Sequence, residues 1–339
     1  ASSLALDIDG ARGELLRADG HLKIDAFGFV QLEGDFAIDK ASAVTPVTLS
    51  DGSTANATAL RIGASNLRAF AGLNGGTDSA IGLELSGVDF GLALMGESLP
   101  AGSSAAPRSW TSLQATADAA AFVGVDGLKV SADTLSIEIN RAGTPLGAVV
   151  DYSLSDPDDG SSVRKTALTV ATSASDAITM TMDGSQGQLL RASGNLDLDV
   201  FGFFQASGGF AIEKRSDTVT LSNATDSAPG STIEVDLLTL GGSGIDAFAG
   251  LNGGSANALG LSLQGVDFGL ALATERLADK TPGRSFTTLK ATAETVGFVG
   301  VDDFDISSTD LSVEINRGVA GTDGAVDVVI DHGLRRRHR

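Results

Sequence analysis

The chain contains no cysteine, and histidine, tryptophan and tyrosine are nearly absent, with three, one and one among its 339 residues. Without cysteine there are no disulfides, no zinc sites with thiolate ligands and no thiol nucleophile. Two of the histidines, His332 and His338, lie near the C-terminal end, and His21 falls at an outward position of an alternating segment. A serine or threonine nucleophile needs an adjacent base, and none of the three is placed for that role. We therefore expect surface histidines, no catalytic residues and no enzyme.

Positive charge is scarce as well. Lys and Arg number 23 against 43 Asp and Glu, which gives a formal net charge of −20. A surface this acidic repels nucleic acids and anionic membranes, so we expect neither as a partner. No run approaches the ~18 apolar residues of a transmembrane helix, and none is expected. Residues 333–339 form a basic tail, which we expect to be disordered or, alternatively, to contact an acidic neighbour.

The N-terminal residues Ala1–Ser3 include neither an initiator methionine nor a signal peptide. This predicts a chain that has been processed or cut from something longer. Proline is rare, with 7 residues, whereas glycine is abundant, with 43, and 42% of the chain is apolar. Such a composition has enough apolar material for a core, and it favours strands joined by tight turns.

The chain is one long unit written twice. AFAGLNGG fills 69–76 and 247–254, GVDFGLAL fills 87–94 and 265–272, and EINR closes both copies at 138–141 and 314–317. We divide the chain into a first repeat unit at 1–155, a second at 156–332 stacked continuously on the first, and the tail at 333–339. The stretch Asp156–Gly160 is the most linker-like, although strand patterns resume soon after it.

Alternation of period two runs through both copies. From Leu16 to Ile38 every second residue is apolar or glycine, and Leu190 to Ile212 repeats the pattern. This predicts strand with one buried face, bending at Gly20, Gly28 and Gly34 while the alternation continues. We expect a turn at Asn74–Gly76, and strand rather than helix over Ala115–Ala121. Polar loops are expected at 41–59, 96–109, 215–232 and 274–285.

These patterns predict an all-β protein. The expected architecture is an elongated β-solenoid built of the two internal repeats, because stacked layers that bury a common core are the usual meaning of such periods. The alternative is a pair of tandem β-sandwich domains, although the long alternation exceeds ordinary sandwich strands.

Three pairs of neighbouring carboxylates could in principle support glycoside hydrolysis. They are Asp7 and Asp9, Asp158 and Asp159, and Asp302 and Asp303. None is flanked by the aromatic residues expected in a sugar cleft, and the only tryptophan, Trp110, stands at a strand start. We interpret these carboxylates as solvated surface.

Calcium is the one cofactor with a sequence pattern to weigh. Gly241–Ala249 fits the GGxGxDxUx nonapeptide, but those sites lie between tandem copies and only one is present here. Its counterpart in the first copy has Arg68 where Asp246 stands. Asp156–Gly160 lacks EF-hand spacing. We expect no metal and no cofactor, with calcium as the alternative. The Gly-rich turns do not resemble phosphate-binding loops.

Two phenylalanine pairs, Phe27 with Phe29 and Phe201 with Phe203, fall at outward positions. One interpretation is that loops such as 41–59 cover them. The other is an apolar patch for a neighbouring layer or chain, which open sheet edges would also attract. Expected partners are thus adjacent repeats and self-assembly through open edges.

The phrases SGNLDLDVFGFFQASGGFAIEK, LSGVDFGLAL and LSIEIN resemble the repeat regions of giant bacterial surface or secreted proteins, often called adhesins. The resemblance lies in repeat rhythm and brings no catalytic signature. It implies an extracellular or cell-surface structural segment, a stalk or adhesive scaffold whose loops contact partners. The alternative function is a β-helix protein that binds or cleaves polysaccharide.

Overall fold

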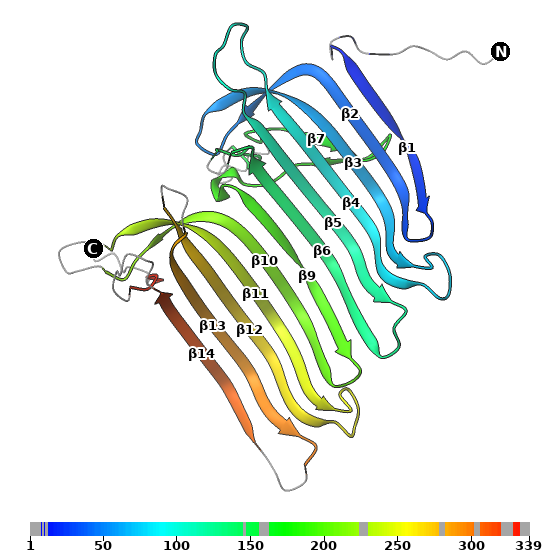
Figure 1. Cartoon of the computed structure of the whole chain (residues 1–339), viewed down its shortest axis with the longest axis vertical. Coiled ribbons are helices and arrows are strands. Elements are labelled where there is room, and N and C mark those ends of the chain that lie inside the picture. Colours follow the sequence, from blue (N-terminus) through cyan, green and yellow to red (C-terminus); the bar gives the residue numbers. More distant parts are fainter. Residues whose placement is uncertain are drawn as a thin grey trace. The chain divides into compact units, whose positions relative to one another are not determined.

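The computed structural model describes residues 8, 10, 13–144, 147–155, 163–223, 230–277, 282–301, 306–319 and 328–332. Within these residues the chain is all-β, as predicted, and its one short helical element is a 3-10 turn at Gly184–Gln186. Twelve long strands belong to one antiparallel sheet in chain order (Figure 1). They are β1 (Leu15–Ala26), β2 (Val30–Thr48), β3 (Thr54–Leu73), β4 (Ile81–Glu97), β5 (Ser109–Val123), β6 (Leu128–Ala142), β9 (Leu189–Val200), β10 (Phe204–Thr220), β11 (Thr232–Leu251), β12 (Leu259–Arg276), β13 (Pro282–Val299) and β14 (Ser307–Val319).

The chain forms two compact units. Unit 1 comprises residues 1–75, 85–118 and 137–188, and unit 2 comprises 76–84, 119–136 and 189–339. Unit 1 also holds a small hairpin, β7 (Thr169–Ala171) with β8 (Ala177–Thr179), which lies against β2 and β3.

The structure does not confirm the predicted solenoid. Strands that neighbour in sequence pair antiparallel, as β1 with β2 and β13 with β14, whereas successive coils of a solenoid stack in parallel. The tandem-sandwich alternative is not seen either, because the only second sheet among the described residues is the two-stranded β7–β8. The alternation was interpreted correctly as strand. The predicted burial of its apolar side is wrong, because Leu16 and Ile24 remain 59% and 43% exposed. The alternating pattern does not specify which strands pair with each other.

A reversal of the chain at Phe27–Gly28 explains why the long alternating segment is two strands. Phe27 and Gly28 both have positive φ, 57° and 70°, and the Phe29 N–H donates to the Ala26 carbonyl oxygen at 3.0 Å. Two central residues at positive φ are typical of the type I′ turn, whose twist suits a hairpin. Gly28 therefore reverses the strand where the sequence predicted a mere bend.

Of the other loop predictions, some are confirmed and some are wrong. The loop at 96–109 and the turn at Asn74–Gly76 are confirmed, as is strand over Ala115–Ala121. The loop predicted at 41–59 is wrong, because β2 continues to Thr48 and β3 begins at Thr54. Residues 215–220 likewise extend β10. The loop prediction failed at 47–57 because the apolar residues of this segment, Val47, Leu49, Ala55 and Ala57, pack into the core of unit 1.

Midway along its strands, the sheet of unit 2 is apolar on one side and polar on the other, and the buried core residues Leu237, Ala273 and Phe286 lie further along the polar side. A single row across its six strands contains only aliphatic side chains, namely Ala192, Ile212, Leu240, Leu270, Leu289 and Ile315. The adjacent row, which points to the opposite side, is Arg191, Glu213, Thr239, Ala271, Thr288 and Asn316. We call these sides the apolar face and the polar face. Ile212, Val313 and Ile315 remain 39%, 42% and 38% exposed on the apolar face.

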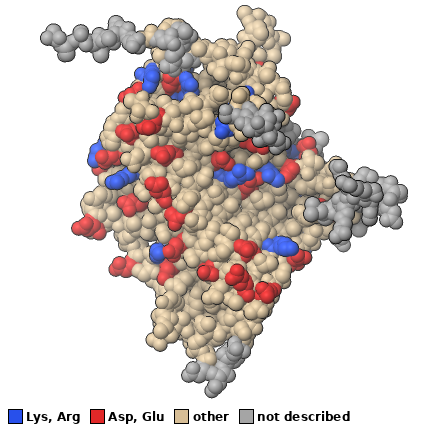
Figure 2. Space-filling view, turned by 180° about the vertical axis from the view of Figure 1, so that it is seen from behind, with Lys and Arg blue, Asp and Glu red and all other residues tan. Residues whose placement is uncertain are grey.

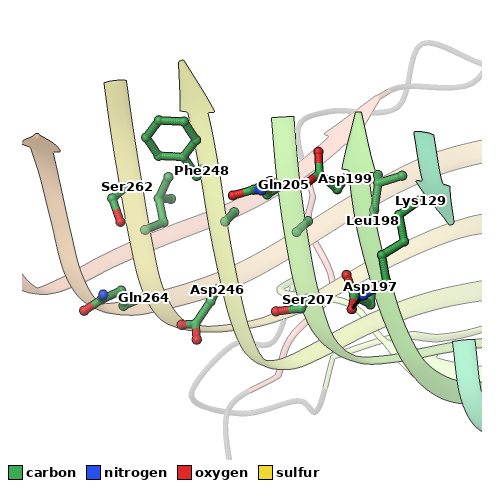
Figure 3. A pocket seen from close by; sticks show the side chains of 13 residues that line it. Lys129, Asp197, Leu198, Asp199, Gln205, Ser207, Asp246, Phe248, Ser262 and Gln264 are labelled. Atoms are coloured by element: carbon green, nitrogen blue, oxygen red, sulfur yellow. Dashed lines mark hydrogen bonds and ion pairs between the residues drawn. The ribbon is translucent and has the colours of Figure 1, made fainter. Parts of the chain in front are cut away.

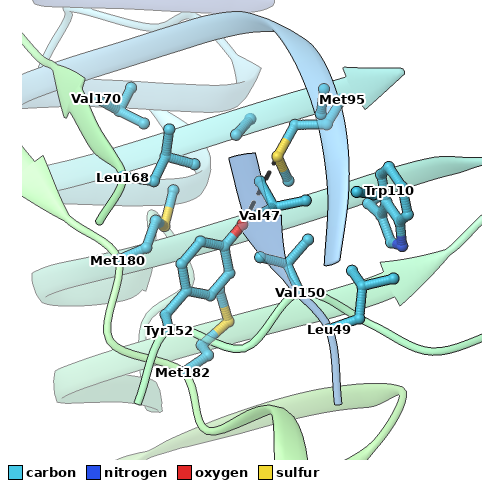
Figure 4. Close-up of a cluster of buried hydrophobic side chains, with 13 residues drawn as sticks. Val47, Leu49, Met95, Trp110, Val150, Tyr152, Leu168, Val170, Met180 and Met182 are labelled. Atoms are coloured by element: carbon cyan, nitrogen blue, oxygen red, sulfur yellow. Dashed lines mark hydrogen bonds between the residues drawn. The ribbon is translucent and has the colours of Figure 1, made fainter. Parts of the chain in front are cut away.

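Each unit has its own core, in which residues near the ends of the strands pack against residues that lie outside the twelve-stranded sheet. In unit 1, Trp110, Tyr152, Met180 and Val170 are among thirteen buried residues that pack together (Figure 4). The Trp110 indole N–H donates to the Ala148 carbonyl oxygen at 2.9 Å. The core of unit 2 is smaller and comprises Leu221, Val235, Leu237, Ala273, Phe286 and Ile330.

Candidate functional site

A polar hollow lies on the polar face of unit 2 (Figure 3). Its volume is about 390 Å³. Polar side chains from consecutive strands line it because residues directly opposite one another in a sheet point to the same side. Those labelled in Figure 3 are Lys129, Asp197, Asp199, Gln205, Ser207, Asp246, Ser262 and Gln264, with Phe248 and Leu198 beside them.

The carboxylates of this hollow already hold partners. Asp199 accepts from the Gly202 N–H at 2.8 Å and from Gln205 Nε2 at 2.7 Å. Gln205 and Gly202 thereby lower the pKa of Asp199. Asp197 pairs with Lys129, and Asp246 accepts from the Gly265 N–H at 3.0 Å. Because its pKa is lowered, Asp199 can accept hydrogen bonds or attract a cation but is a poor general acid.

The matching positions of unit 1 carry different side chains. Lys23 stands where unit 2 has Asp197, Glu33 where it has Ser207, and Arg68 where it has Asp246. Lys23 Nζ donates to Glu33 at 2.8 Å. Longer charged groups thus occupy a surface that the shorter side chains of unit 2 leave hollow. This difference between the copies lies on strands and not in loops. A position-by-position comparison of the two copies would have found it.

Both units repeat a clamp made of Glu, Arg and an aromatic ring. In unit 1, Arg108 Nη2 and Nε donate to the two oxygens of Glu97 at 2.7 and 2.9 Å, and the guanidinium lies 5.4 Å from the Trp110 ring centroid. Arg284 makes the same fork with Glu275, 6.0 Å from Phe286. Bidentate pairing stacked on a ring fixes the strand ends on either side of a loop. We assign the clamp a structural role.

The histidines lie where the sequence predicted surface positions. His21 is exposed, and its hydrogen bond with Asp35 at 3.0 Å is the main cause of its raised pKa. His332 is also exposed and lies 3.0 Å from Thr288 Oγ1 through its Nε2. The three carboxylate pairs, His338, Asp156–Gly160 and the basic tail lie outside the described residues.

The calcium pattern Gly241–Ala249 falls inside strand β11 rather than in a loop. Among the described residues, no three His, Asp or Glu side chains gather closely enough to hold a metal ion. The calcium alternative therefore stays a prediction. Trp110 is only 2% exposed, so its ring cannot serve as a platform for a sugar.

The outward phenylalanines are exposed in both copies. Phe27 is 96% exposed, Phe29 54%, Phe201 56% and Phe203 57%. No described loop covers Phe27, and the segment 41–59 that was expected to do so is mostly strand. The predicted cover by 41–59 is therefore not seen, and contact of these rings with a neighbouring layer or chain stays a prediction.

The molecule shows more acidic than basic side chains on the face drawn in Figure 2. No helix within the described part of the chain is long and apolar enough to cross a membrane. Comparison with known proteins gives no match to a family model, to a curated protein or to a solved structure. The geometry of the chain itself must therefore carry any functional argument.

Proposed function

We propose that this chain is a structural repeat module of a large bacterial extracellular or cell-surface protein. In this proposal it acts as a scaffold in a stalk or adhesive surface, and its partners are modules of the same kind. The observation that carries the proposal is the apolar face of unit 2. An antiparallel sheet ordinarily buries one face and solvates the other. Here the face with charged pairs, such as Arg191 with Glu213 at 2.6 Å, also carries the buried core of unit 2 toward its strand ends, whereas residues of the apolar face such as Val313 remain 42% exposed.

The size of the apolar face matches a protein–protein contact. Six strands ~4.8 Å apart, with ~10 residues each at ~3.3 Å, present roughly 900 Å². A stable interface buries ~800 Å² on each partner. Two such faces packed together would form the interior of a sandwich, with the sheets ~10 Å apart. Unit 1 repeats the pattern in its row of Ala18, Ile38 and Ile62, so an array of modules would offer the same contact repeatedly.

Two neighbouring residues of β14 test the contact. Val313 lies on the apolar face and is 42% exposed, while Ser312 lies on the polar face and is also exposed. Because they share one edge strand, Val313→Glu and Ser312→Glu disturb edge pairing equally and differ only in the face they charge. We expect the wild-type chain and Ser312→Glu to self-associate in sedimentation velocity runs. Val313→Glu should weaken association at least ~10-fold, because a charge would be buried without a partner.

Circular dichroism spectra should match across the three proteins, which separates lost association from lost folding. A wild-type chain that stays monomeric up to ~100 μM would overturn the proposed contact. Equal weakening by both variants would show instead that association runs along the strand edge. The polysaccharide alternative has less support, because Trp110 is buried and the carboxylates of the polar hollow are held by neighbours.

A further inference from the structure

In unit 1, two glycines make room for the β7–β8 hairpin. A Cβ on Gly63 would overlap the carbonyl oxygen of Ala171. A Cβ on Gly91 would lie 3.2 Å from Cβ of Val170 and 3.4 Å from Cε of Met180. The hairpin therefore packs on a surface of small residues that includes Ala37, Gly63, Ser65 and Gly91, which we call the shelf. Ala37 is only 1% exposed.

Unit 2 carries the same shelf. Gly241, Gly269 and Ser243 occupy the positions of Gly63, Gly91 and Ser65 in the repeated sequence. A Cβ on Gly269 would meet nothing within 4 Å, and one on Gly241 would meet only the Phe268 carbonyl oxygen at 3.8 Å. Ala211, the counterpart of Ala37, is exposed. No described segment of unit 2 lies over this shelf.

A hollow of about 460 Å³ marks the uncovered shelf. Its lining includes Ser193, Gly209, Ala211, Gly241 and Ser243. In unit 1, the Ser65 hydroxyl donates to the carbonyl oxygen of Thr172 at 3.5 Å, just after β7. Ser243 offers the same donor in unit 2. The shape, the backbone access and the polar group that serve the hairpin in unit 1 are therefore all repeated in unit 2, where no described segment covers them.

We propose that this hollow of unit 2 binds a β-hairpin with the chemistry of residues 167–182, supplied by another module of the same repeat. In unit 1 the inward residues of that segment, Leu168, Val170, Met180 and Met182, are at most 7% exposed, while Thr169 and Thr179 face solvent. The occupant is thus a short hairpin with aliphatic and methionine side chains on one side and threonines on the other. The contact lies on the polar face and does not depend on the association of apolar faces proposed above.

The probe is a synthetic peptide with the sequence of residues 167–182, titrated into the full chain and followed by isothermal calorimetry. We expect saturable binding. Gly241→Val should weaken peptide binding at least ~10-fold. The valine side chain would fill the space that, beside Gly63 in unit 1, is taken by the carbonyl oxygen of Ala171. The variant should fold normally, since valine suits a strand and the space is open. A second peptide with Val170→Asp and Met180→Asp should not bind.

The competing outcome is exchange of the peptide with the hairpin of unit 1. In that case binding would survive Gly241→Val, and the proposal would be wrong. Absence of any binding by the wild-type chain would overturn it as well. Val313→Glu, which charges the apolar face, should leave peptide affinity unchanged, so failure of one proposal is distinguishable from failure of the other.

Discussion

Replacing Glu97 by glutamine tests how much the Glu–Arg–aromatic clamp contributes to stability. Hydrogen bonds from Arg108 lower the pKa of Glu97 from its usual 4.5 to about 2. One pKa unit corresponds to ~1.4 kcal/mol, so the ionised form is favoured in the fold by at most ~3.4 kcal/mol. The Glu97 side chain is 10% exposed but that of Arg108 is 43% exposed, and solvent screening reduces this value. We expect Glu97→Gln to lower the free energy of unfolding by ~1–2 kcal/mol near neutral pH.

The pH dependence follows from the sign of the change. Because the pKa of Glu97 is lower in the folded chain, its contribution is fully present above ~4.5 and is lost as pH falls toward about 2. Urea unfolding of wild type and Glu97→Gln over this range should therefore show a difference that shrinks with acid. A double-mutant cycle with Arg108→Gln isolates the pair from the remaining titrations.

The control is the exposed pair of Lys23 and Glu33, which also lies at 2.8 Å but has side chains that are 70% and 49% exposed. Its coupling free energy should be near zero, because exposed ion pairs contribute little. If Glu97 and Arg108 couple no more strongly than this pair, or if their coupling does not change between neutral and acid pH, the reasoning from burial and bidentate geometry is wrong.

Four further substitutions, two of them compared with each other, test the fold. Phe27→Asn should raise the free energy of unfolding by ~1 kcal/mol in thermal melts, because Asn tolerates positive φ in this turn and the exposed ring makes no described packing contact; a destabilised variant would contradict the turn assignment. Tyr152→Phe should cost ~1 kcal/mol by removing the hydroxyl that lies 2.7 Å from the buried Ser112 hydroxyl, and an unchanged urea midpoint would argue against that bond. Asn140→Ala should cost more than Asn316→Ala, since each amide donates to a carbonyl oxygen but Asn140 is 1% exposed and Asn316 is exposed; equal losses of stability would show that burial does not set the cost.

Strand content could be predicted because alternation is a local property. Leu16 to Ile38 alternates without interruption, and both strands it contains, β1 and β2, keep that alternation. The reversal at Phe27–Gly28 was missed because a phenylalanine at positive φ has no sequence signature, whereas Asn74–Gly75 does. Because a bend was predicted there instead of a turn, the two strands of a hairpin were interpreted as one strand that winds around a solenoid core.

The candidate site was largely outside the reach of sequence patterns. Asp197, Ser207 and Asp246 lie far apart in the chain and meet only because β9, β10 and β11 pair in one register. The clamp of Glu97 and Arg108 spans a loop that was predicted, yet nothing in its spacing indicates a fork stacked on Trp110. For the clamp, the available signal was the repetition of Glu, Arg and an aromatic residue in both copies.

By itself, the sequence determined that the protein is all-β, that it consists of one repeated unit, and that thiol chemistry is absent. These properties depend on side-chain period and composition, which each segment carries locally. Only the tertiary structure decided that the strands form antiparallel hairpins, that residues of the apolar face stay exposed, and that unit 1 covers a glycine shelf which no described segment of unit 2 covers. Those features depend on which strands pair and in which register, and period two leaves both choices undetermined.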